Sequence, residues 1–162
     1  MRLMKGCSGV WIAAAAAAID QISKAAVRGL SSRQSAAPLW ELPGVVAVRP
    51  TFNTGVAFSA FSGGGLALTI ATALLIALQS GWLIARPERQ PKWARAGLWL
   101  IVGGGLGNLY DRIVYGCVTD FIELRFVRFA VFNVADIAVC LGALIAAAAL
   151  LIDEHRKESA HG

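Results

Sequence analysis

The chain has 162 residues, of which 57% are hydrophobic and 15% are charged, and its formal net charge is +5. This apolar excess is unusual for a soluble domain and indicates an integral membrane protein with one domain, residues 1–162. The positive charge does not indicate a nucleic-acid-binding protein, because the Lys and Arg residues are scattered through connections and termini instead of forming one stripe.

Four apolar segments are long enough, or nearly so, to cross a hydrocarbon core as helices, which takes about 20 residues. They cover residues 10–27, 66–85, 94–109 and 134–152. The predicted fold is therefore a membrane all-α four-helix bundle, with two longer connections, about residues 28–63 and 110–133, on the same side. Lys and Arg are denser on the other side, which predicts that both termini are cytoplasmic.

The first apolar segment follows Arg2 and Lys5 and could be taken for a cleavable secretory signal. It contains Asp20 and Lys24, however, and three further spans follow it, so we expect it to remain as a helix. These two charges stand four residues apart on one helix face, as in an ion pair. Because a lone charge in a membrane is costly, we expect the pair to line the bundle interior in a supporting role.

The first long connection is rich in β-branched and aromatic residues over positions 45–58, which favours short strands punctuated by Pro50 and Gly55. These strands predict a small extracytoplasmic β-rich cradle. Asn53 stands among apolar neighbours. It is either a turn-forming residue before Gly55 or a polar side chain with a function.

The third apolar segment ends in a group of small and polar residues. Gly103 and Gly107 have the spacing that lets two helices approach closely. Asn108 and Arg112 are four residues apart, so they share one face of the helix end. Asp111, beside Arg112, is expected to have a structural or orienting role.

Two further aspartates lie within and just after the second connection. Residues 121–126 alternate in polarity, which predicts a strand able to pair with the first connection. Asp120 precedes this segment and Asp136 stands near the start of the fourth span, so both can lie at one membrane surface. Two carboxyl groups about 3 Å apart share one proton, so one can act as general base and the other as general acid in peptide hydrolysis.

Each of these aspartates also has a structural interpretation. Asn133 is a good helix N-cap, and Asp136 falls three residues later, where it can close a capping box. Asp120 could pair with Arg112 or Arg125.

The sequence lacks the residues that other hydrolytic mechanisms would need within the bundle. Both histidines, His155 and His161, lie in the C-terminal tail, which excludes a Ser/His pair or an HExxH zinc site within the bundle. Hydrolysis would therefore depend on the aspartates, and no metal or organic cofactor is expected.

The chain resembles lipoprotein signal peptidase, the type II signal peptidase of bacteria, in four motifs: DQISK (20–24), FNTGVAFS (52–59), GNLYDRIVYGCVTDFI (107–122) and FNVAD (132–136). The resemblance implies an aspartyl protease with a β-cradle whose catalytic pair is Asp120 and Asp136. The other matched positions, implied to support the pair or to hold substrate, are Asp20, Lys24, Asn53, Gly107, Asn108, Arg112, Asn133 and Ala135. Ala130 and Val131 stand where family members often have Trp-Pro, a departure that concerns the turn into the fourth span.

By the same resemblance the protein is expected to cleave diacylglyceryl-modified prolipoproteins on the amino side of the lipidated cysteine. It would work as a monomer at the periplasmic face of the bacterial inner membrane, in contact with the phospholipid bilayer, and globomycin would inhibit it. An alternative from another class is a small transporter or channel component with Asp20 and Asp136 as proton or ion ligands. A transporter would place ionisable groups near the midplane, whereas these cluster near one surface.

Overall fold

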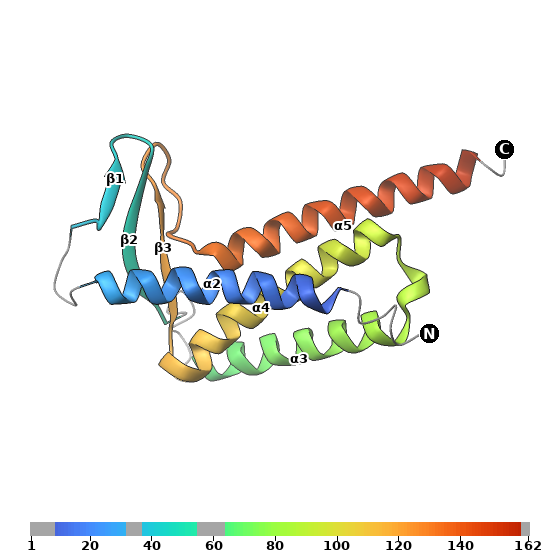
Figure 1. The fold of residues 1–162 in the computed structure, drawn as a ribbon, viewed down its shortest axis with the longest axis horizontal. Coiled ribbons are helices and arrows are strands. Elements are labelled where there is room, and N and C mark those ends of the chain that lie inside the picture. Colours follow the sequence, from blue (N-terminus) through green and yellow to red (C-terminus); the bar gives the residue numbers. More distant parts are fainter. Residues whose placement is uncertain (1–8, 32–36, 55–63, 160–162) are drawn as a thin grey trace.

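The computed structural model describes residues 9–31, 37–54 and 64–159 (Figure 1). These residues form four long helices with a small sheet at one end, and both the helices and a sheet are as the sequence predicts. The elements in chain order are α2 (Val10–Leu30), β1 (Trp40–Leu42), β2 (Val46–Asn53), α3 (Gly64–Ala85), the short 3-10 helix η2 (Pro87–Arg89), α4 (Lys92–Tyr115), β3 (Val118–Leu124) and α5 (Val134–Ser159).

Helix α4 is the centre of the bundle, because α2, α3 and α5 all pack against it. The sheet lies at one end of the helices, while the start of α2 and the end of α5 lie at the opposite end (Figure 1). Both terminal helices therefore begin or end on the side away from the sheet, in agreement with the predicted topology. Which side faces the cytoplasm stays a prediction.

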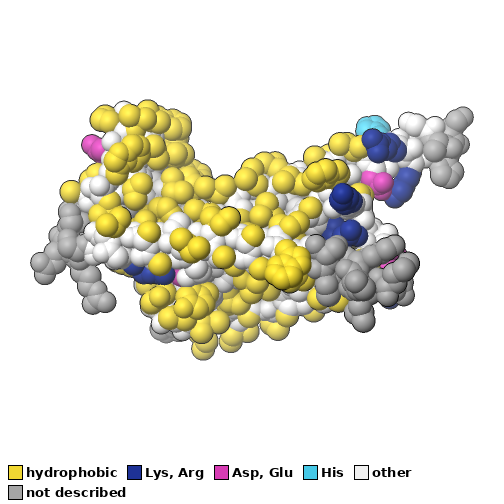
Figure 2. Space-filling model, viewed as in Figure 1, with side chains coloured by type: hydrophobic (Ala, Val, Ile, Leu, Met, Phe, Trp, Pro, Cys, Tyr) yellow, Lys and Arg dark blue, Asp and Glu magenta, His cyan; other side chains and the backbone are white. Residues whose placement is uncertain are grey.

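The surface of the bundle suits a lipid environment. Helices α2, α3 and α5 are each long and apolar enough to cross a membrane, by length and composition. Large apolar side chains of α3 point outward: Leu74, Leu75 and Leu78 are 58%, 67% and 71% exposed. Hydrophobic side chains cover most of the visible face of the helices in Figure 2.

Helix α4, which contains the predicted span 94–109, is not among these apolar helices in the described part of the chain. It begins with Lys92 and Arg95, carries Asp111 and Arg112 near its end, and is rich in glycine. Because three other helices surround it, α4 needs less apolar surface than they do. Its crossing of the membrane therefore stays a prediction.

Glycines let the helices around α4 approach closely. A Cβ on Gly97 would lie 2.5 Å from the carbonyl oxygen of Gly142, and a Cβ on Gly103 would lie 2.6 Å from that of Ala13. Neither position can take a larger side chain without moving backbone. The packing role predicted for Gly103 is confirmed.

Three helices extend beyond their predicted ends. Helix α2 continues to Leu30, α4 to Tyr115 and α5 to Ser159, so residues 110–115 are helical instead of belonging to the second connection. The apolar pattern marks only the membrane-length part of a helix. Polar turns can prolong it, as the Asp153–Lys157 ion pair does four residues apart in α5.

The sheet is antiparallel, in the order β1-β2-β3. The predicted pairing of the two connections is confirmed, with Val48 opposite Ile122 and Thr51 opposite Asp120. The register shifts between these pairs, at Pro50, which has no N–H to donate to a ladder. Strand β1 was not predicted, β3 covers 118–124 instead of 121–126, and positions 56–58 lie outside the described residues.

Candidate active site

Asp120 is positioned by the turn that joins α4 to the sheet. Helix α4 ends at Tyr115 and is capped by Gly116, whose φ of 70° is the left-handed conformation that glycine adopts most easily. The Gly116 N–H donates to the Arg112 carbonyl. The chain then enters β3, where Asp120 is 4% exposed. Because Thr51 pairs with Asp120, Asn53 lies diagonally across on the same face of the sheet.

Asp136 is positioned by the start of α5. A bridge between Ile122 and Phe132 places the next residue, Asn133, beside the aspartate end of β3. Asn133 Oδ1 accepts from the Asp136 N–H at 3.1 Å, and Asp136 Oδ2 accepts from the Asn133 N–H at 3.1 Å. The predicted capping box is therefore confirmed in a chain that has Ala130 and Val131 before it.

One asparagine touches both aspartates. The buried Asn133 Nδ2 donates to Asp120 Oδ1 at 2.6 Å and to Asn108 Oδ1 at 3.0 Å. Asn108 Nδ2 in turn donates to Asp136 Oδ1 at 2.9 Å. Asn53 Nδ2 completes the set, donating to Asp120 Oδ2 at 3.1 Å. Side chains from β2, β3, α4 and the start of α5 thus form one hydrogen-bonded cluster.

The contacts of Asp120 bear on two expectations. Among the described residues no hydrogen bond joins its carboxyl group to that of Asp136; asparagine side chains hold both groups instead. The close pair sharing one proton across about 3 Å therefore stays a prediction. Asp120 also makes no ion pair with Arg112 or Arg125 in the described structure, and Arg125 pairs with Glu123.

A buried ionic network supports the cluster from α2. Lys24 Nζ lies 2.8 Å from Asp20 Oδ2 and 3.4 Å from Asp111 Oδ2, and all three side chains are fully buried. The predicted ion pair and its interior position are both confirmed. Asp20 Oδ1 also accepts from the Ala135 N–H at 2.9 Å, which ties α2 to the first turn of α5. Gly107 leaves the space for this carboxylate, because a Cβ there would overlap it.

Lys24 also fixes how the Asn108 amide points. Its Nζ donates to Asn108 Oδ1 at 2.8 Å, so this oxygen accepts from both Lys24 and Asn133. An amide carries its oxygen and its nitrogen on opposite sides, and the surrounding donors decide its orientation. The Asn108 nitrogen is therefore directed at Asp136.

Sequence reasoning missed Gln21, Arg28 and Thr119. Gln21 Nε2 donates to Asp111 Oδ1 at 2.9 Å, and Arg28 donates to Thr119 Oγ1 at 3.0 Å, next to Asp120. Asp111 Oδ2 accepts from the Thr119 N–H at 2.8 Å, which fits its expected orienting role. The spacing of Gln21, Lys24 and Arg28 by three and four residues places them on one helix face and could have revealed them.

The surroundings of the Asp120 carboxyl group shift its pKa upward. Burial raises its pKa above the usual range, because a charged carboxylate loses hydration there. Hydrogen bonds from Asn53 and Asn133 oppose this rise, and the charge of Asp136 adds to it. Asp136 is only half-buried and so keeps some access to water.

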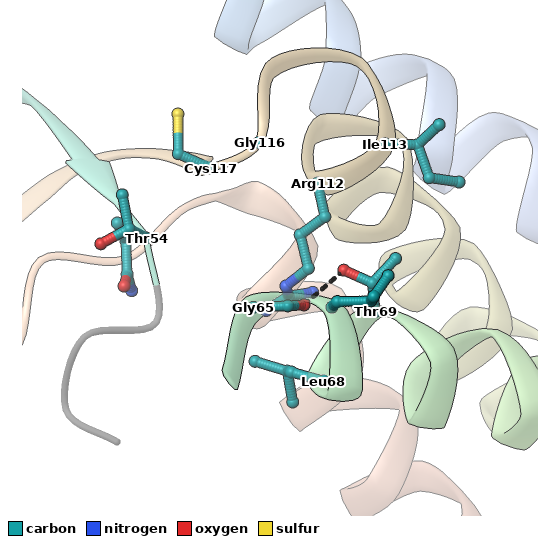
Figure 3. A pocket seen from close by; sticks show the side chains of 10 residues that line it. Thr54, Gly65, Leu68, Thr69, Arg112, Ile113, Gly116 and Cys117 are labelled. Atoms are coloured by element: carbon teal, nitrogen blue, oxygen red, sulfur yellow. Dashed lines mark hydrogen bonds between the residues drawn. The ribbon is translucent and has the colours of Figure 1, made fainter. Parts of the chain in front are cut away.

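A pocket of about 440 Å³ lies beside the cluster, between the end of β2, the start of α3 and the end of α4. Asn53, which contacts Asp120, is part of its wall. The Arg112 side chain extends toward the first turns of α3 in the close-up of Figure 3. The wall is mostly apolar, with Leu66, Leu68 and Ile113 among its residues. The pocket therefore joins an apolar wall to a polar corner that includes Asn53 and Arg112.

The fold and the site define a membrane-bound hydrolase with two carboxyl groups at the junction of a helical bundle and a sheet. The family model described as "Signal peptidase (SPase) II" matches residues 12–152. The chain belongs to this family, whose members are aspartic proteases.

Curated relatives agree over most of the chain. The lipoprotein signal peptidase of Thermosynechococcus vestitus is 37% identical over 135 residues, covering 82% of this chain and 84% of the relative. That of Pseudomonas aeruginosa is 34% identical over 166 residues, covering 94% and 93%. A bacterial membrane enzyme solved by the in meso method at 1.9 Å has the same fold, with a TM-score of 0.79, 24% identity and coverage of 89% and 92%.

Proposed function

We propose that this protease removes the signal peptide from diacylglyceryl-modified prolipoproteins on the amino side of the lipidated cysteine, with Asp120 and Asp136 as its catalytic pair. The observation that carries the catalytic assignment is the shared contact with Asn133, which donates to Asp120 through its side chain and to Asp136 through its backbone. A purely structural cap would need only the second of these bonds.

The two carboxyl groups have different surroundings, which suggests different roles. Asp120 is buried with a raised pKa, so it is suited to carry the proton and act as general acid. Asp136 is at the N-terminus of α5, where the helix dipole and the Asn133 N–H stabilise negative charge, so it is suited to act as general base.

In this mechanism Asp136 takes a proton from water as the water oxygen bonds to the scissile carbonyl carbon. Asp120 donates its proton to the carbonyl oxygen, giving a tetrahedral diol. The C–N bond then breaks, Asp136 passes its proton to the leaving nitrogen of the cysteine, and a diol hydroxyl returns a proton to Asp120. The products are a peptide carboxylic acid and a free amino terminus, and both aspartates regain their starting states.

The pocket beside the cluster is suited to a lipid-linked peptide. Its apolar residues would contact hydrocarbon, while Arg112 supplies a cation near the polar corner. The guanidinium already donates to the Asn108 carbonyl at the limiting distance of 3.5 Å. We assign it the role of holding a substrate carbonyl group. From the family membership we further propose that the reaction occurs at the outer surface of a bacterial inner membrane, that the enzyme works as a monomer and that globomycin inhibits it.

The transporter alternative has less support. Asp20, one of its two proposed ligands, is fully buried, paired with Lys24 and hydrogen-bonded to the Ala135 backbone. A carboxylate with these partners has little capacity left for a transported ion. Membership of a protease family also favours hydrolysis.

The direct test uses purified enzyme in detergent with a lipidated prolipoprotein, followed by mass spectrometry of the products. We expect one cleavage, immediately before the lipidated cysteine, and its loss when globomycin is added. A matched substrate in which the lipidated cysteine is replaced by serine cannot receive the lipid and is expected to remain intact. Cleavage of both substrates at equal rates would contradict the proposed substrate class.

A further inference from the structure

A second groove lies at the end of the bundle away from the sheet. It has a volume of about 490 Å³ and runs between the start of α4 and the last turns of α5. Ile145 and Ile152 form much of its apolar wall, and Ala148 and Ala149 leave it open because their side chains are small. Trp93, Asp153 and Arg156 form its polar end.

The charges at this polar end are unevenly matched. Asp153 is engaged by Lys157 at 2.5 Å. Arg156 makes no hydrogen bond or ion pair with any residue that the structure describes, and its side chain is exposed. Lys92 adds a second cation, 6.0 Å from the ring of Trp93. Lys and Arg side chains gather at this end of the molecule in Figure 2. The end of the groove therefore offers uncompensated positive charge.

The position of the groove along α5 corresponds to the membrane surface opposite the active site. Asp136 and Arg156 are both on α5, twenty residues and so about 30 Å apart, which is the thickness of a hydrocarbon core. With Asp136 at one surface, Arg156 lies at the headgroup level of the other. The wall from Ile145 to Ile152 then covers about 10 Å of hydrocarbon depth. Trp93, which is 68% exposed, has the position that indole rings prefer at this interface.

We propose that this groove binds one anionic phospholipid of the leaflet opposite the active site, with an acyl chain between α4 and α5 and the phosphate at Arg156. Charge complementarity selects this occupant. A net-negative headgroup such as phosphatidylglycerol meets Arg156 and Lys92 without a compensating cation of its own. A zwitterionic headgroup would bring an ammonium group toward the same two cations.

The test measures binding of short-chain phosphatidylglycerol to the detergent-solubilised full chain by native mass spectrometry, with phosphatidylcholine and glycerol phosphate as comparison ligands. We expect phosphatidylglycerol to bind at least about five times more tightly than phosphatidylcholine. Arg156→Gln should weaken phosphatidylglycerol binding more than phosphatidylcholine binding and so remove this preference. Ala149→Leu should fill the groove and weaken both lipids while Arg156 is retained.

Arg89→Gln is the matched control, because Arg89 is an exposed arginine at the same end that does not line the groove. It should keep the preference for phosphatidylglycerol. The proposal is wrong if Arg89→Gln lowers the preference as much as Arg156→Gln, or if Ala149→Leu leaves lipid binding unchanged. Glycerol phosphate binding as tightly as the lipid would also contradict it, because the groove would then contribute nothing. Unchanged thermal unfolding in lipid-free detergent establishes that each variant is folded.

Discussion

Asn133 performs two separable tasks, and they make it the most informative single residue of the site. Its side-chain oxygen and backbone N–H cap α5, while its side-chain nitrogen holds Asp120 and Asn108. A serine can supply the cap oxygen but has no amide nitrogen. The two tasks can therefore be tested apart.

We predict that Asn133→Ser lowers kcat by about 100-fold, the effect typical of losing one placed donor in an active site. Its thermal unfolding should stay closer to wild type than that of Asn133→Ala, which also loses the cap and with it about 1 kcal/mol. The measurements are prolipoprotein cleavage and thermal unfolding in detergent. Near wild-type turnover in Asn133→Ser would show that the amide does not organise the carboxyl groups.

Asp120 predicts a particular dependence of stability on pH. Because its pKa is raised in the fold, ionisation of this group favours the unfolded chain, so wild-type stability falls as pH rises from the unfolded pKa through the folded one. The Asp120→Asn variant has no ionisable group at this position, so its stability does not fall with pH for this reason. The melting temperature of the variant minus that of wild type should therefore increase from pH 4 to pH 7. A difference that shrinks over this range would mean that Asp120 is stabilised as a carboxylate.

At the scale of residues, local patterns predicted contacts along one helix better than contacts between elements. The Asp20–Lys24 pair and the Asn133–Asp136 capping box follow from spacings of four and three residues, and both are present. The bonds from Asn133 and Asn53 to Asp120 depend on strand register, which no short pattern contains. The sharing of one proton between the two carboxyl groups stays a prediction.

At the scale of elements, the place of α4 among the other helices depends on close packing more than on apolar surface. Gly97 faces Gly142 across the contact with α5, where a Cβ would meet backbone atoms. A Cβ added to Gly81 of α3 would meet no atom within 4 Å, so this residue offers a matched comparison.

We predict that Gly97→Ala destabilises the protein by about 1–3 kcal/mol, because α4 and α5 must separate to admit the methyl group. Gly81→Ala should leave the free energy of unfolding unchanged or raise it by up to about 1 kcal/mol, since alanine restricts the unfolded chain. Chemical denaturation in detergent micelles measures both. Equal effects of the two substitutions would remove the packing argument for α4.

The elements themselves were largely predictable because each membrane span needs a long apolar run. The ends of the helices were not predictable, because polar turns prolong α2, α4 and α5 beyond the hydrophobic stretch. Strand β1 is only three residues long, and it pairs with β2 through register contacts that composition does not contain. Whether a short edge strand of this kind forms depends on its pairing with the neighbouring strand.

At the scale of the whole molecule, the sheet lies on the opposite side from the start of α2 and the end of α5. Glu41 is exposed on β1, and Ser159 is the last residue of α5. The density of Lys and Arg predicts that the Ser159 side is cytoplasmic.

This topology can be measured with a membrane-impermeant thiol reagent on spheroplasts, in a background where Cys7, Cys117 and Cys140 are replaced by serine. The Glu41→Cys variant should be labelled in intact spheroplasts, whereas Ser159→Cys should be labelled only after permeabilisation. The reverse pattern would place the carboxyl cluster on the cytoplasmic side and would contradict the proposed site of reaction.

The central claim is that Asp120 and Asp136 together perform the hydrolysis, and it is tested most directly by single substitutions of each with Asn. The measurement is the single-turnover rate of prolipoprotein cleavage by purified variants whose unfolding in detergent shows that they are folded. We predict that each variant loses at least about 1,000-fold in rate, because the acid and the base act as a unit. A folded variant of either kind that cleaves at close to the wild-type rate would contradict the assignment.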